Sequence, residues 1–380
     1  MKLTLGKVGH GGVCIAHADD GRVVFVRHGI PGEVVRVAVT EEKSSYLRAD
    51  VVEVIDASPQ RVTAPCPHAG PGKCGGCDWQ HVDLAEQRRM KAAVVAEQLQ
   101  RLAGIEREVD VEPVPGERDG LHWRTRMRFA VDRHGRLGLH RHRSHQIEPI
   151  EDCLIAVPEV DVPALVERSW PREAEVTVDI SNVGERAVAV GPHQETVQER
   201  AAGRDWRVPV GGFWQVHLGA ADLLASTVVS LAQPAAGEQA LDLYAGVGLF
   251  AGALAAAGVS VTAVESERRA AAAARRNLAD LDVTVVDGRV DHWLPRATIA
   301  ADVVVLDPPR RGAGRAVTEA IAALRPRVVV YVACEPAALA RDTATLAECG
   351  YALGELKAFD LFPMTAHVEC VAAFTPTPPR

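Results

Sequence analysis

The first 57 residues contain short apolar runs separated by turn residues, a pattern that predicts β-strands. Five runs have strand length: residues 3–8, 12–17, 23–27, 33–40 and 46–55. Turn sequences lie between some of them, as in Asp19-Asp20-Gly21 and Ile30-Pro31-Gly32. Five short strands favour a small barrel of the OB type, which binds nucleic acid in many proteins and is purely structural in others.

The middle of the chain changes its pattern twice. Residues 59–77 are rich in proline, glycine and cysteine without a hydrophobic period, so they predict a linker or a metal-organised loop. Apolar residues then recur at helical spacing, which predicts a helix from Asp83 to a stop at Gly104. From about residue 109 to 208 the chain has mostly strand patterns, among them 124–131, 137–142 and 176–180.

After Gly211, strand patterns alternate with alanine-rich helical stretches, which is typical of a parallel α/β sheet. The predicted strands are 240–244, 259–265, 283–287, 303–307 and 328–333. The predicted fold class is therefore α/β: a Rossmann-like domain preceded by a small OB-type barrel and a β-rich central domain. We expect domains at 1–57, 58–208 and 209–380, with helix 83–104 a candidate to pack on the last of them.

Composition narrows the class of protein. The 380 residues are long for one domain, and 42 Lys and Arg against 50 Asp and Glu give a net charge of −8, which argues against a uniformly positive surface for nucleic acid. No apolar run approaches the roughly 18 residues of a membrane span. The N-terminal residues lack a signal-peptide pattern, so a cytoplasmic location is expected, with the eight cysteines as thiols, metal ligands or nucleophiles.

A glycine loop connects two predicted strands of the last domain. Gly246-x-Gly248-x-x-Ala251 follows the first strand, and the second ends on Glu265, an arrangement known from dinucleotide sites. A pyrophosphate is an anion, whereas the ammonium and sulfonium of S-adenosylmethionine are cations, so nearby carboxylates distinguish the two. Asp242, Asp287 and Asp307 favour the cationic ligand. The alternative is structural: Asp242 caps a turn and Glu265 is a surface residue.

Two further strand ends carry reactive side chains. Cys334 follows strand 328–333 beside the expected ligand site, which makes it a candidate nucleophile; the alternative is a small buried thiol. Glu369 begins an apolar strand, which indicates a partly desolvated base, with a surface glutamate as the alternative. Pro308 and Pro309 directly after Asp307 predict a rigid loop.

These motifs together resemble one family over nearly the whole chain. The barrel resembles a TRAM domain, Gly211-Gly212-Phe213-Trp214-Gln215-Val216-His217 resembles an F-x-Q-V motif, and Asp307-Pro-Pro-Arg, the Cys334-x-Pro turn and His367-Val-Glu369 follow in family order. The chain is thereby similar to the S-adenosylmethionine-dependent RNA 5-methyluridine methyltransferases. The resemblance implies cofactor contacts at Gln215, Tyr244, Glu265, Asp287 and Asp307, beside Gly246 and Gly248 of the glycine loop. It also makes Cys334 the nucleophile and Glu369 the base.

The implied reaction is methylation of uracil C5. Because C5 is a poor nucleophile, the Cys334 thiolate first adds to C6; C5 then takes the methyl group, Glu369 removes the C5 proton, and elimination of Cys334 restores the base. The target uridine must be flipped out or lie in a loop. Two residues depart from the family pattern. Leu249 replaces a polar residue, and Glu335 replaces an asparagine, which raises the expected pKa of Cys334 unless the carboxylate points away.

Four cysteines form a candidate metal site. Cys66, Cys74 and Cys77 lie within twelve positions, and Cys153 follows later in the chain. In a cytoplasmic protein this spacing indicates a metal rather than disulfides, and by itself it fits zinc as well as iron–sulfur. The family resemblance of Cys74-Gly-Gly-Cys77 implies a [4Fe-4S] cluster on all four, with zinc as the alternative. The remaining thiols at positions 14, 349 and 370 are expected to be ordinary buried ones.

Residues 118–146 are strongly basic. Arginines at 118, 124, 126, 128, 133, 136, 141 and 143 oppose aspartates at 119 and 132, a local charge of +6. The alternation of Arg124, Arg126 and Arg128 places three guanidinium groups on one strand face, which predicts phosphate contacts; a solvated sheet face is the alternative. The expected partner is tRNA or ribosomal RNA and no membrane, and a monomer is expected. A non-catalytic RNA-binding or assembly factor, or methylation of a different RNA base or atom, are the other functions considered.

Overall fold

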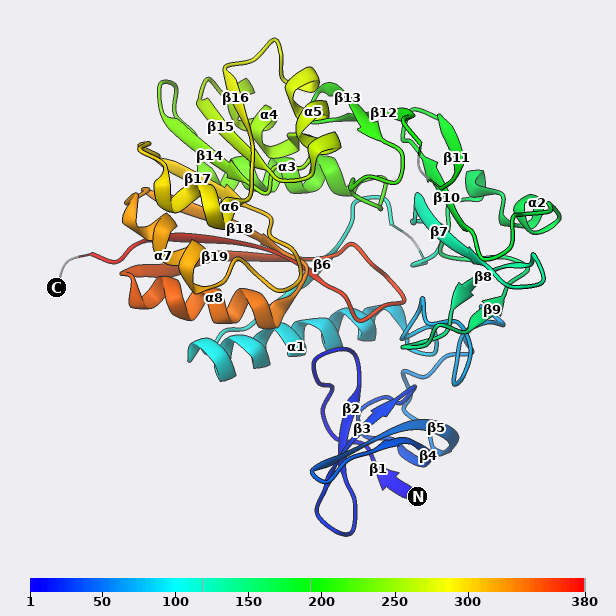
Figure 1. The fold of residues 1–380 in the computed structure, drawn as a ribbon. Coiled ribbons are helices and arrows are strands. Elements are labelled where there is room, and N and C mark those ends of the chain that lie inside the picture. Colours follow the sequence, from blue (N-terminus) through cyan, green and yellow to red (C-terminus); the bar gives the residue numbers. More distant parts are fainter. Residues whose placement is uncertain (118, 192, 379–380) are drawn as a thin grey trace.

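The computed structural model describes residues 1–117, 119–191 and 193–378, and its fold is mixed α/β. Figure 1 shows three parts: an N-terminal barrel, a β-rich middle part and a C-terminal sheet covered by helices. The predicted fold class is confirmed. Arg118, counted above in the basic segment, lies outside the described residues. The domain boundaries at 57/58 and 208/209 stay predictions.

The N-terminal part contains the five strands that its apolar pattern predicts. They are β1 (Lys2–Thr4), β2 (Cys14–His17), β3 (Val23–Arg27), β4 (Val34–Glu42) and β5 (Tyr46–Asp56), in the sheet order β1-β4-β5-β3-β2. Beyond β1 the chain pairs with β2: Gly6 N donates to Ile15 O at 2.8 Å, and Ile15 N donates to Lys7 O at 3.0 Å. These bonds join the two outermost strands, so the sheet closes on itself and leaves no open edge there.

A long helix, α1 (Leu84–Ala103), begins and ends where its capping residues predict. The Asp83 carboxylate accepts a hydrogen bond from Ala85 N at 3.0 Å, and Gly104 ends the helix in the left-handed conformation, with φ of 67°. Figure 1 shows α1 running beneath α8 (Pro336–Glu348), against which it packs. The strand after it, β6 (Val111–Pro113), joins the edge of the C-terminal sheet. These elements therefore pack with the C-terminal sheet rather than with the middle part.

The middle part consists of a five-stranded sheet in the order β11-β10-β7-β8-β9 and a hairpin of β12 and β13. Its elements are β7 (Arg126–Val131), β8 (Leu137–His140), β9 (Ile147–Pro149), η1 (Pro158–Val160), α2 (Val162–Val166), β10 (Glu175–Ile180), β11 (Arg186–Val190), β12 (Thr196–Ala201) and β13 (Arg204–Pro209). Alternate residues of β7 and β10, such as Met127, Phe129, Val176 and Val178, form the core of this part. The opposite face of β7 carries Arg126 and Arg128, and Arg124 lies just before the strand.

The C-terminal part is an eight-stranded sheet in the order β16-β15-β14-β17-β18-β20-β19-β6. Its further elements are α3 (Ala220–Ala232), β14 (Gln239–Leu243), α4 (Leu249–Ala256), β15 (Ser260–Glu265), α5 (Arg268–Asn277), β16 (Val283–Asp287), α6 (Val290–Trp293), η2 (Leu294–Arg296), β17 (Val303–Leu306), α7 (Arg315–Ala323), β18 (Val328–Ala333), β19 (Tyr351–Asp360) and β20 (Glu369–Pro376). The five predicted strands are parallel neighbours, and β20 is antiparallel to β18 and β19. Their carboxyl ends consequently meet at one edge of the sheet.

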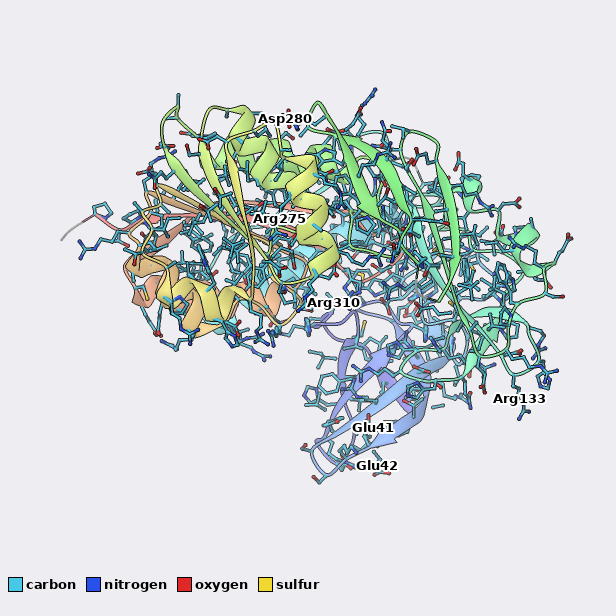
Figure 2. The ribbon with its side chains drawn as sticks, turned by 45° about the horizontal axis from the view of Figure 1, so that its top comes forward. Glu41, Glu42, Arg133, Arg275, Asp280 and Arg310 are labelled. Carbon is cyan, nitrogen blue, oxygen red and sulfur yellow. The ribbon has the colours of Figure 1, made fainter. Side chains whose placement is uncertain are left out.

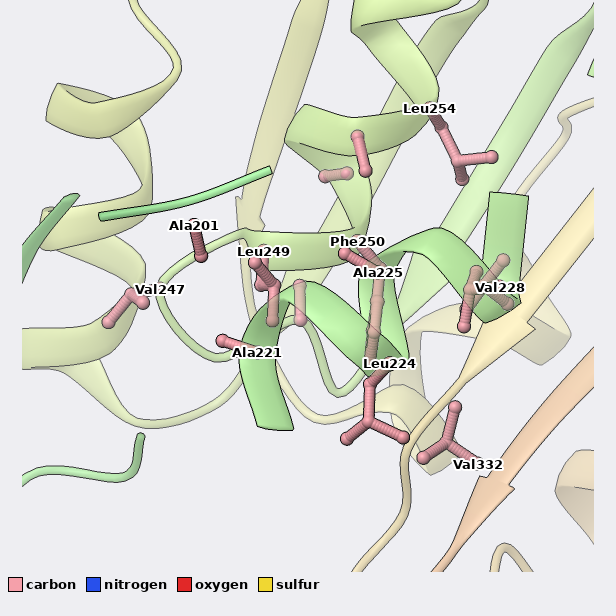
Figure 3. Close-up of a cluster of buried hydrophobic side chains, with 14 of the residues drawn as sticks. Ala201, Ala221, Leu224, Ala225, Val228, Val247, Leu249, Phe250, Leu254 and Val332 are labelled. Carbon is pink, nitrogen blue, oxygen red and sulfur yellow. The ribbon is translucent and has the colours of Figure 1, made fainter. Parts of the chain in front are cut away.

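Small and branched apolar side chains pack the helices onto the sheet. Figure 3 shows Leu224 and Val228 of α3 directed toward Val332 of β18, with Leu249 and Phe250 of α4 in the same cluster. Leu249 is buried in this cluster, so the position where the family has a polar residue is part of the core here. Within the described residues, we find no helix that is both long and apolar enough to cross a membrane.

Candidate active site

The carboxyl edge of the sheet borders a cavity of about 1520 Å³. Open α/β sheets bind their ligands at this edge, where the helices that follow the strands begin. Eight of the residues predicted from the sequence line it: Arg124, Gln215, Tyr244, Gly246, Glu265, Asp307, Cys334 and Glu369. Gly75, Gly76 and Asp78 of the cysteine loop line it as well, so the cavity is built from the C-terminal sheet, the middle part and that loop.

The glycine loop adopts a conformation that requires glycine. Gly246 and Gly248 have φ of 57° and 98°, in the left-handed region. A β-carbon on Gly248 would lie 2.5 Å from Cδ1 of Leu278, so this glycine lets the loop and α5 approach each other, and it does not itself line the cavity. Gly246 N donates to Oε2 of Glu265 at 2.9 Å. This bond holds the Glu265 carboxylate at the loop, facing the cavity.

The predicted aspartates have different surroundings. Asp242 is fully buried and accepts a hydrogen bond from Ala251 N at 2.8 Å in the first turn of α4, and burial raises its pKa to about 7. Its role is therefore the structural one. Asp287 is exposed and lies outside the cavity lining. The chain turns after β16 and presents Asp291, which pairs with Arg289 at 2.6 Å, to the cavity instead.

Tyr244 and the loop after β13 form one wall of the cavity. Tyr244 directly follows β14 with φ of 66°, and its N donates to Val264 O at 3.0 Å. Burial raises the pKa of this phenol to about 12, so it stays protonated at neutral pH. In the loop, Gln215 follows the buried Trp214, whereas Phe213 is 69% exposed and lines the cavity. Phe213 belongs to the motif recognised in the sequence but was not selected there as a site residue.

Cys334 and Glu369 face each other across two neighbouring strands. Ala333 of β18 pairs with Cys370 of β20 in antiparallel register, so one further step along both chains brings Cys334 opposite Glu369. Burial raises the pKa of Glu369 well above its usual value, and the nearby Asp307 raises it further. Burial also raises the pKa of Asp307 to about 7. The site therefore holds two carboxyl groups that bind protons more tightly than carboxyls in water.

The Cys334 thiol shares this acidic environment. Burial raises its pKa to about 12, with Glu369 and Asp307 adding to the increase, Arg310 opposing it and Glu335 raising it least. A thiol of this kind needs a positive charge or a nearby base before it becomes a thiolate. The carboxylate of Glu335 has its oxygen Oε1 3.2 Å from Nδ1 of His10 in the barrel.

The loop between β19 and β20 is held by many hydrogen bonds and lines the cavity with Phe362, Thr365 and His367. Met364 N donates to Oε1 of Gln87 at 2.8 Å, and Ala366 N donates to Oδ2 of Asp78 at 3.2 Å. Burial lowers the pKa of His367 to about 4, so its ring is neutral. The sequence motif contained His367 without indicating that the cysteine loop and α1 fix its position.

Arginines other than the predicted ones also reach the cavity. Arg269, Arg289, Arg310, Arg311 and Arg315 line it. Arg310 Nη2 lies 3.3 Å from Nε2 of His367, and Figure 2 places Arg310 near the centre of the molecule, far from Arg133 at the outer edge of the middle part. These side chains lie in loops and first helical turns after the strands. Their positions around the cavity therefore depend on the order of the strands in the sheet, which the sequence alone does not give.

Among the predicted phosphate-binding arginines, Arg126 differs from the other two. It is 8% exposed, and its guanidinium pairs with Asp179 at 2.8 Å and with Glu199 at 3.2 Å. The prediction that Arg126 contacts phosphate is therefore wrong, because two carboxylates from β10 and β12 cover its guanidinium. Ion pairs between residues far apart in the chain leave no local sequence signal. Arg124 lines the cavity, and Arg128 is exposed and donates to Gly211 O at 2.8 Å.

The four predicted metal ligands lie near one another. Burial raises the pKa values of Cys74, Cys77 and Cys153, and the charges of neighbouring cysteines raise them further. Cys66 is one of these neighbours. Gln80 Nε2 donates to Sγ of Cys77 at 3.2 Å. In the part of the chain that the structure describes, however, no three His, Cys, Asp or Glu side chains are close enough together to hold a metal ion. The donor chemistry fits a metal; the present side-chain arrangement is not a ligand shell.

Comparison with protein families matches three segments of the chain. A model described as TRAM domain matches residues 1–52, a methyltransferase small domain matches 217–326, and a tRNA (uracil-5-)-methyltransferase model matches 296–375. The last segment contains Asp307, Cys334 and Glu369.

Relatives match over nearly the full length. An uncharacterized RNA methyltransferase of Streptomyces avermitilis is 47% identical over 99% of this chain and 98% of its own, and one of Bifidobacterium longum is 38% identical over 96% and 94%. Among solved structures, the tRNA (uracil-54, C5)-methyltransferase of Pyrococcus abyssi in complex with S-adenosyl-L-homocysteine has the same fold, with a TM-score of 0.77, 24% identity and 99% coverage of both chains.

Proposed function

Because the chain belongs to the RNA methyltransferase family of these relatives, we propose that it transfers a methyl group from S-adenosylmethionine to C5 of a uridine in structured RNA. The observation that carries the proposal is the placement of Cys334 opposite Glu369 at the cavity edge, with Asp307 beside them. A nucleophile and a base at one edge suit an aromatic carbon that must first be activated and then lose a proton.

The cavity suits a cationic cofactor. Glu265 and Asp307 present carboxylates to it, and Gly246 contributes backbone without a side chain. A positive charge there would favour the ionised forms of Asp307 and Glu369 and thereby offset their raised pKa values. When bound, S-adenosylmethionine supplies an electrophilic methyl group. We assign the contacts to Gln215, Tyr244, Gly246, Glu265 and Asp307, with Gly248 and Asp287 supporting the site from outside the cavity lining.

The chain's own residues account for the remaining steps. The Cys334 thiolate bonds to C6 of uracil, which breaks the C5–C6 double bond and makes C5 nucleophilic. After C5 has gained the methyl group, the Glu369 carboxylate takes the C5 proton. The electron pair of that C–H bond restores the double bond, and the C6–S bond breaks to release Cys334 as a thiolate. A carboxylate with a raised pKa is a stronger base than one in water, which suits Glu369 for this role.

A direct test uses tritiated S-adenosylmethionine with total RNA, followed by nucleoside analysis. We expect labelled 5-methyluridine from the wild-type protein and none from Cys334→Ala, while Cys349→Ala, at the far end of α8, serves as the matched control. Wild-type turnover by Cys334→Ala would refute the covalent mechanism. Binding of RNA without label would favour the assembly-factor alternative, and label in another nucleoside would favour a different target atom.

We further propose that Cys66, Cys74, Cys77 and Cys153 hold a [4Fe-4S] cluster, with zinc as the alternative. Cysteine thiols that lie close enough to affect one another's pKa values are the donors that both an iron–sulfur cluster and zinc prefer. Binding would require the side chains to rotate toward a common centre. Anaerobic purification followed by iron, sulfide and zinc analysis distinguishes the outcomes, because a coloured iron-containing protein supports the cluster and a colourless protein with stoichiometric zinc supports the alternative.

The RNA substrate is proposed to be tRNA or ribosomal RNA, taken up by a monomer in the cytoplasm. The match of residues 296–375 to the tRNA (uracil-5-)-methyltransferase family favours tRNA. Assays with purified tRNA and with ribosomal RNA as separate substrates decide between them, since only the substrate class acquires label.

A further inference from the structure

A loop of the N-terminal barrel reaches the catalytic edge of the C-terminal sheet. Trp79 Nε1, in the cysteine loop, donates to Gly12 O at 3.0 Å. A β-carbon on Gly12, whose φ is +77°, would lie 2.5 Å from the β-carbon of Ala366. The barrel loop is therefore in close backbone contact with the segment that carries His367 into the cavity. Such a close approach, at a positive φ, accommodates only glycine at position 12.

Within this loop, His10 faces Glu335. Its Nδ1 lies 3.2 Å from Oε1 of Glu335, and among the described residues that buried oxygen has no hydrogen bond of good geometry. Glu335 occupies the N-cap position of α8, directly after Cys334, but its side chain does not cap the helix. An asparagine, found here in the family pattern, has the length to cap a helix. The longer glutamate extends to the barrel instead.

The contact affects the charge around the nucleophile. The groups that act on the Cys334 thiol are Glu369, Asp307, Arg310 and Glu335, and the adjacent Glu335 acts least of the four. A carboxylate next to a thiol ordinarily disfavours the thiolate. Here the imidazole of His10 is the polar group that faces this carboxylate, and its Nδ1 is able to donate toward it whether or not the ring is charged.

We propose that His10 of the barrel is a positioning residue for the nucleophile: it acts through Glu335, holding that carboxylate toward the barrel and away from the Cys334 thiol. The inference rests on the proposed role of Cys334. It gives the barrel a part in preparing the catalytic turn, in addition to any contact it makes with RNA. His10 is exposed and Glu335 is one-fifth exposed, so both tolerate substitution without a cavity in the core.

The test measures the thiolate directly in the RNA-free protein. The rate of alkylation of Cys334 by iodoacetamide is followed by peptide mass spectrometry as a function of pH, with Cys349 in the same chain as an internal reference. We expect His10→Ala to slow alkylation at a given pH by about threefold, the effect of half a pKa unit, and Glu335→Gln to accelerate it by a similar factor. His10→Asn, which keeps a donor, should restore part of the rate.

A double substitution and a control variant make the test specific. In the Glu335→Gln background, His10→Ala should have no further effect, because the proposed action passes through the carboxylate. Lys7→Ala removes another ion pair of the barrel, to Glu97 on α1, and should leave the rate unchanged.

Wild-type alkylation of His10→Ala, or an equal slowing in both backgrounds, overturns the proposal. This readout requires no RNA and no methyl transfer. Methylation by Cys334→Ala would refute the proposed mechanism. That outcome is distinguishable from failure of the His10 proposal, which the alkylation rates test.

Discussion

At the scale of single residues, the proposed chemistry depends on backbone register more than on sequence proximity. Cys334 and Glu369 are far apart in the chain, and the antiparallel pairing of β18 with β20 places them opposite each other. Asp307 reaches the same edge from β17. Burial raises the pKa values of all three groups, Asp307 raises those of Glu369 and Cys334 further, and a cation in the cavity would lower all three.

Replacing the proposed base separates the two halves of the reaction. In Glu369→Gln the thiolate is still able to add to C6, but the C5 proton has no acceptor, so a covalent protein–RNA species should accumulate while turnover falls by roughly 10²–10⁴-fold. Denaturing gels with labelled RNA measure the adduct, and methyl incorporation measures turnover. Glu355→Gln, an exposed position on β19, is the matched control. Unchanged turnover in Glu369→Gln would assign the base elsewhere.

Single residues were predictable where the sequence motif itself fixes the geometry. Gly246, Glu265, Asp307, Cys334 and Glu369 all line the cavity because each lies at a strand end that the hydrophobic pattern had located. Predictions that required knowledge of neighbouring strands were less accurate. Asp287 lies outside the cavity lining, and Arg126 is covered by carboxylates from two other strands.

At the scale of elements, α1 supports the loop between β19 and β20. Lys91 is fully buried, pairs with Asp360 at the end of β19, and donates to Phe362 O at 3.0 Å. One turn earlier, Gln87 donates to Trp79 O at 3.1 Å and accepts from Met364 N at 2.8 Å. Met364 has φ of 65°, an unfavourable conformation that these bonds maintain. The helix thus fixes the loop that carries His367.

Breaking the buried pair should cost stability. Lys91→Met leaves the Asp360 carboxylate buried without its cation, and we expect a loss of about 3–5 kcal/mol in the free energy of unfolding. Urea unfolding followed by circular dichroism measures the change. Arg89→Met, on the same helix with an exposed side chain, should change stability by no more than about 0.5 kcal/mol. Equal midpoints for the two variants would contradict the structural role of the pair.

Regular elements were predicted well because their signals are local. The parallel strands and α1 have clear hydrophobic periods and capping residues, and each appears within a few residues of its predicted bounds. The insertion of β20 between β18 and β19, and the addition of β6 to the sheet edge, depend on contacts between distant segments. No local pattern encodes that order, which is why the arrangement of arginines and loops around the cavity was not foreseen.

At the scale of the whole molecule, the C-terminal sheet, the middle part and the cysteine loop contribute different residues to one cavity. The C-terminal sheet supplies the proposed reacting groups, the middle part supplies Arg124, and the cysteine loop supplies Asp78. The net charge of −8 therefore conceals a local distribution in which several arginines face the cavity. Electrostatic attraction of RNA requires only such a local surface, not a basic protein.

The arginines should differ in their effects on RNA binding. Charge reversal at Arg124 and Arg128 should weaken binding and reduce the salt dependence by roughly 0.7 per lost phosphate contact on single-stranded RNA. Arg126→Glu should instead destabilise the fold, because it places a third carboxylate beside Asp179 and Glu199. Binding titrations at several salt concentrations and thermal unfolding distinguish these effects. An unchanged salt slope for Arg124→Glu and Arg128→Glu would favour a merely solvated face.

The place of β20 in the sheet has a consequence for how the protein matures. Strands β19 and β6 connect to the rest of the sheet through β20, which follows both in the chain. Before residues 369–376 are in place, those two strands have no route into the sheet, and the base is absent from its position opposite Cys334. The strand that completes the sheet is thus also the strand that brings Glu369 opposite Cys334. A chain in which β20 is not yet paired would hold the Cys334 thiol without Glu369 opposite it, so the proposed reactive pair forms only when β20 takes its place in the sheet.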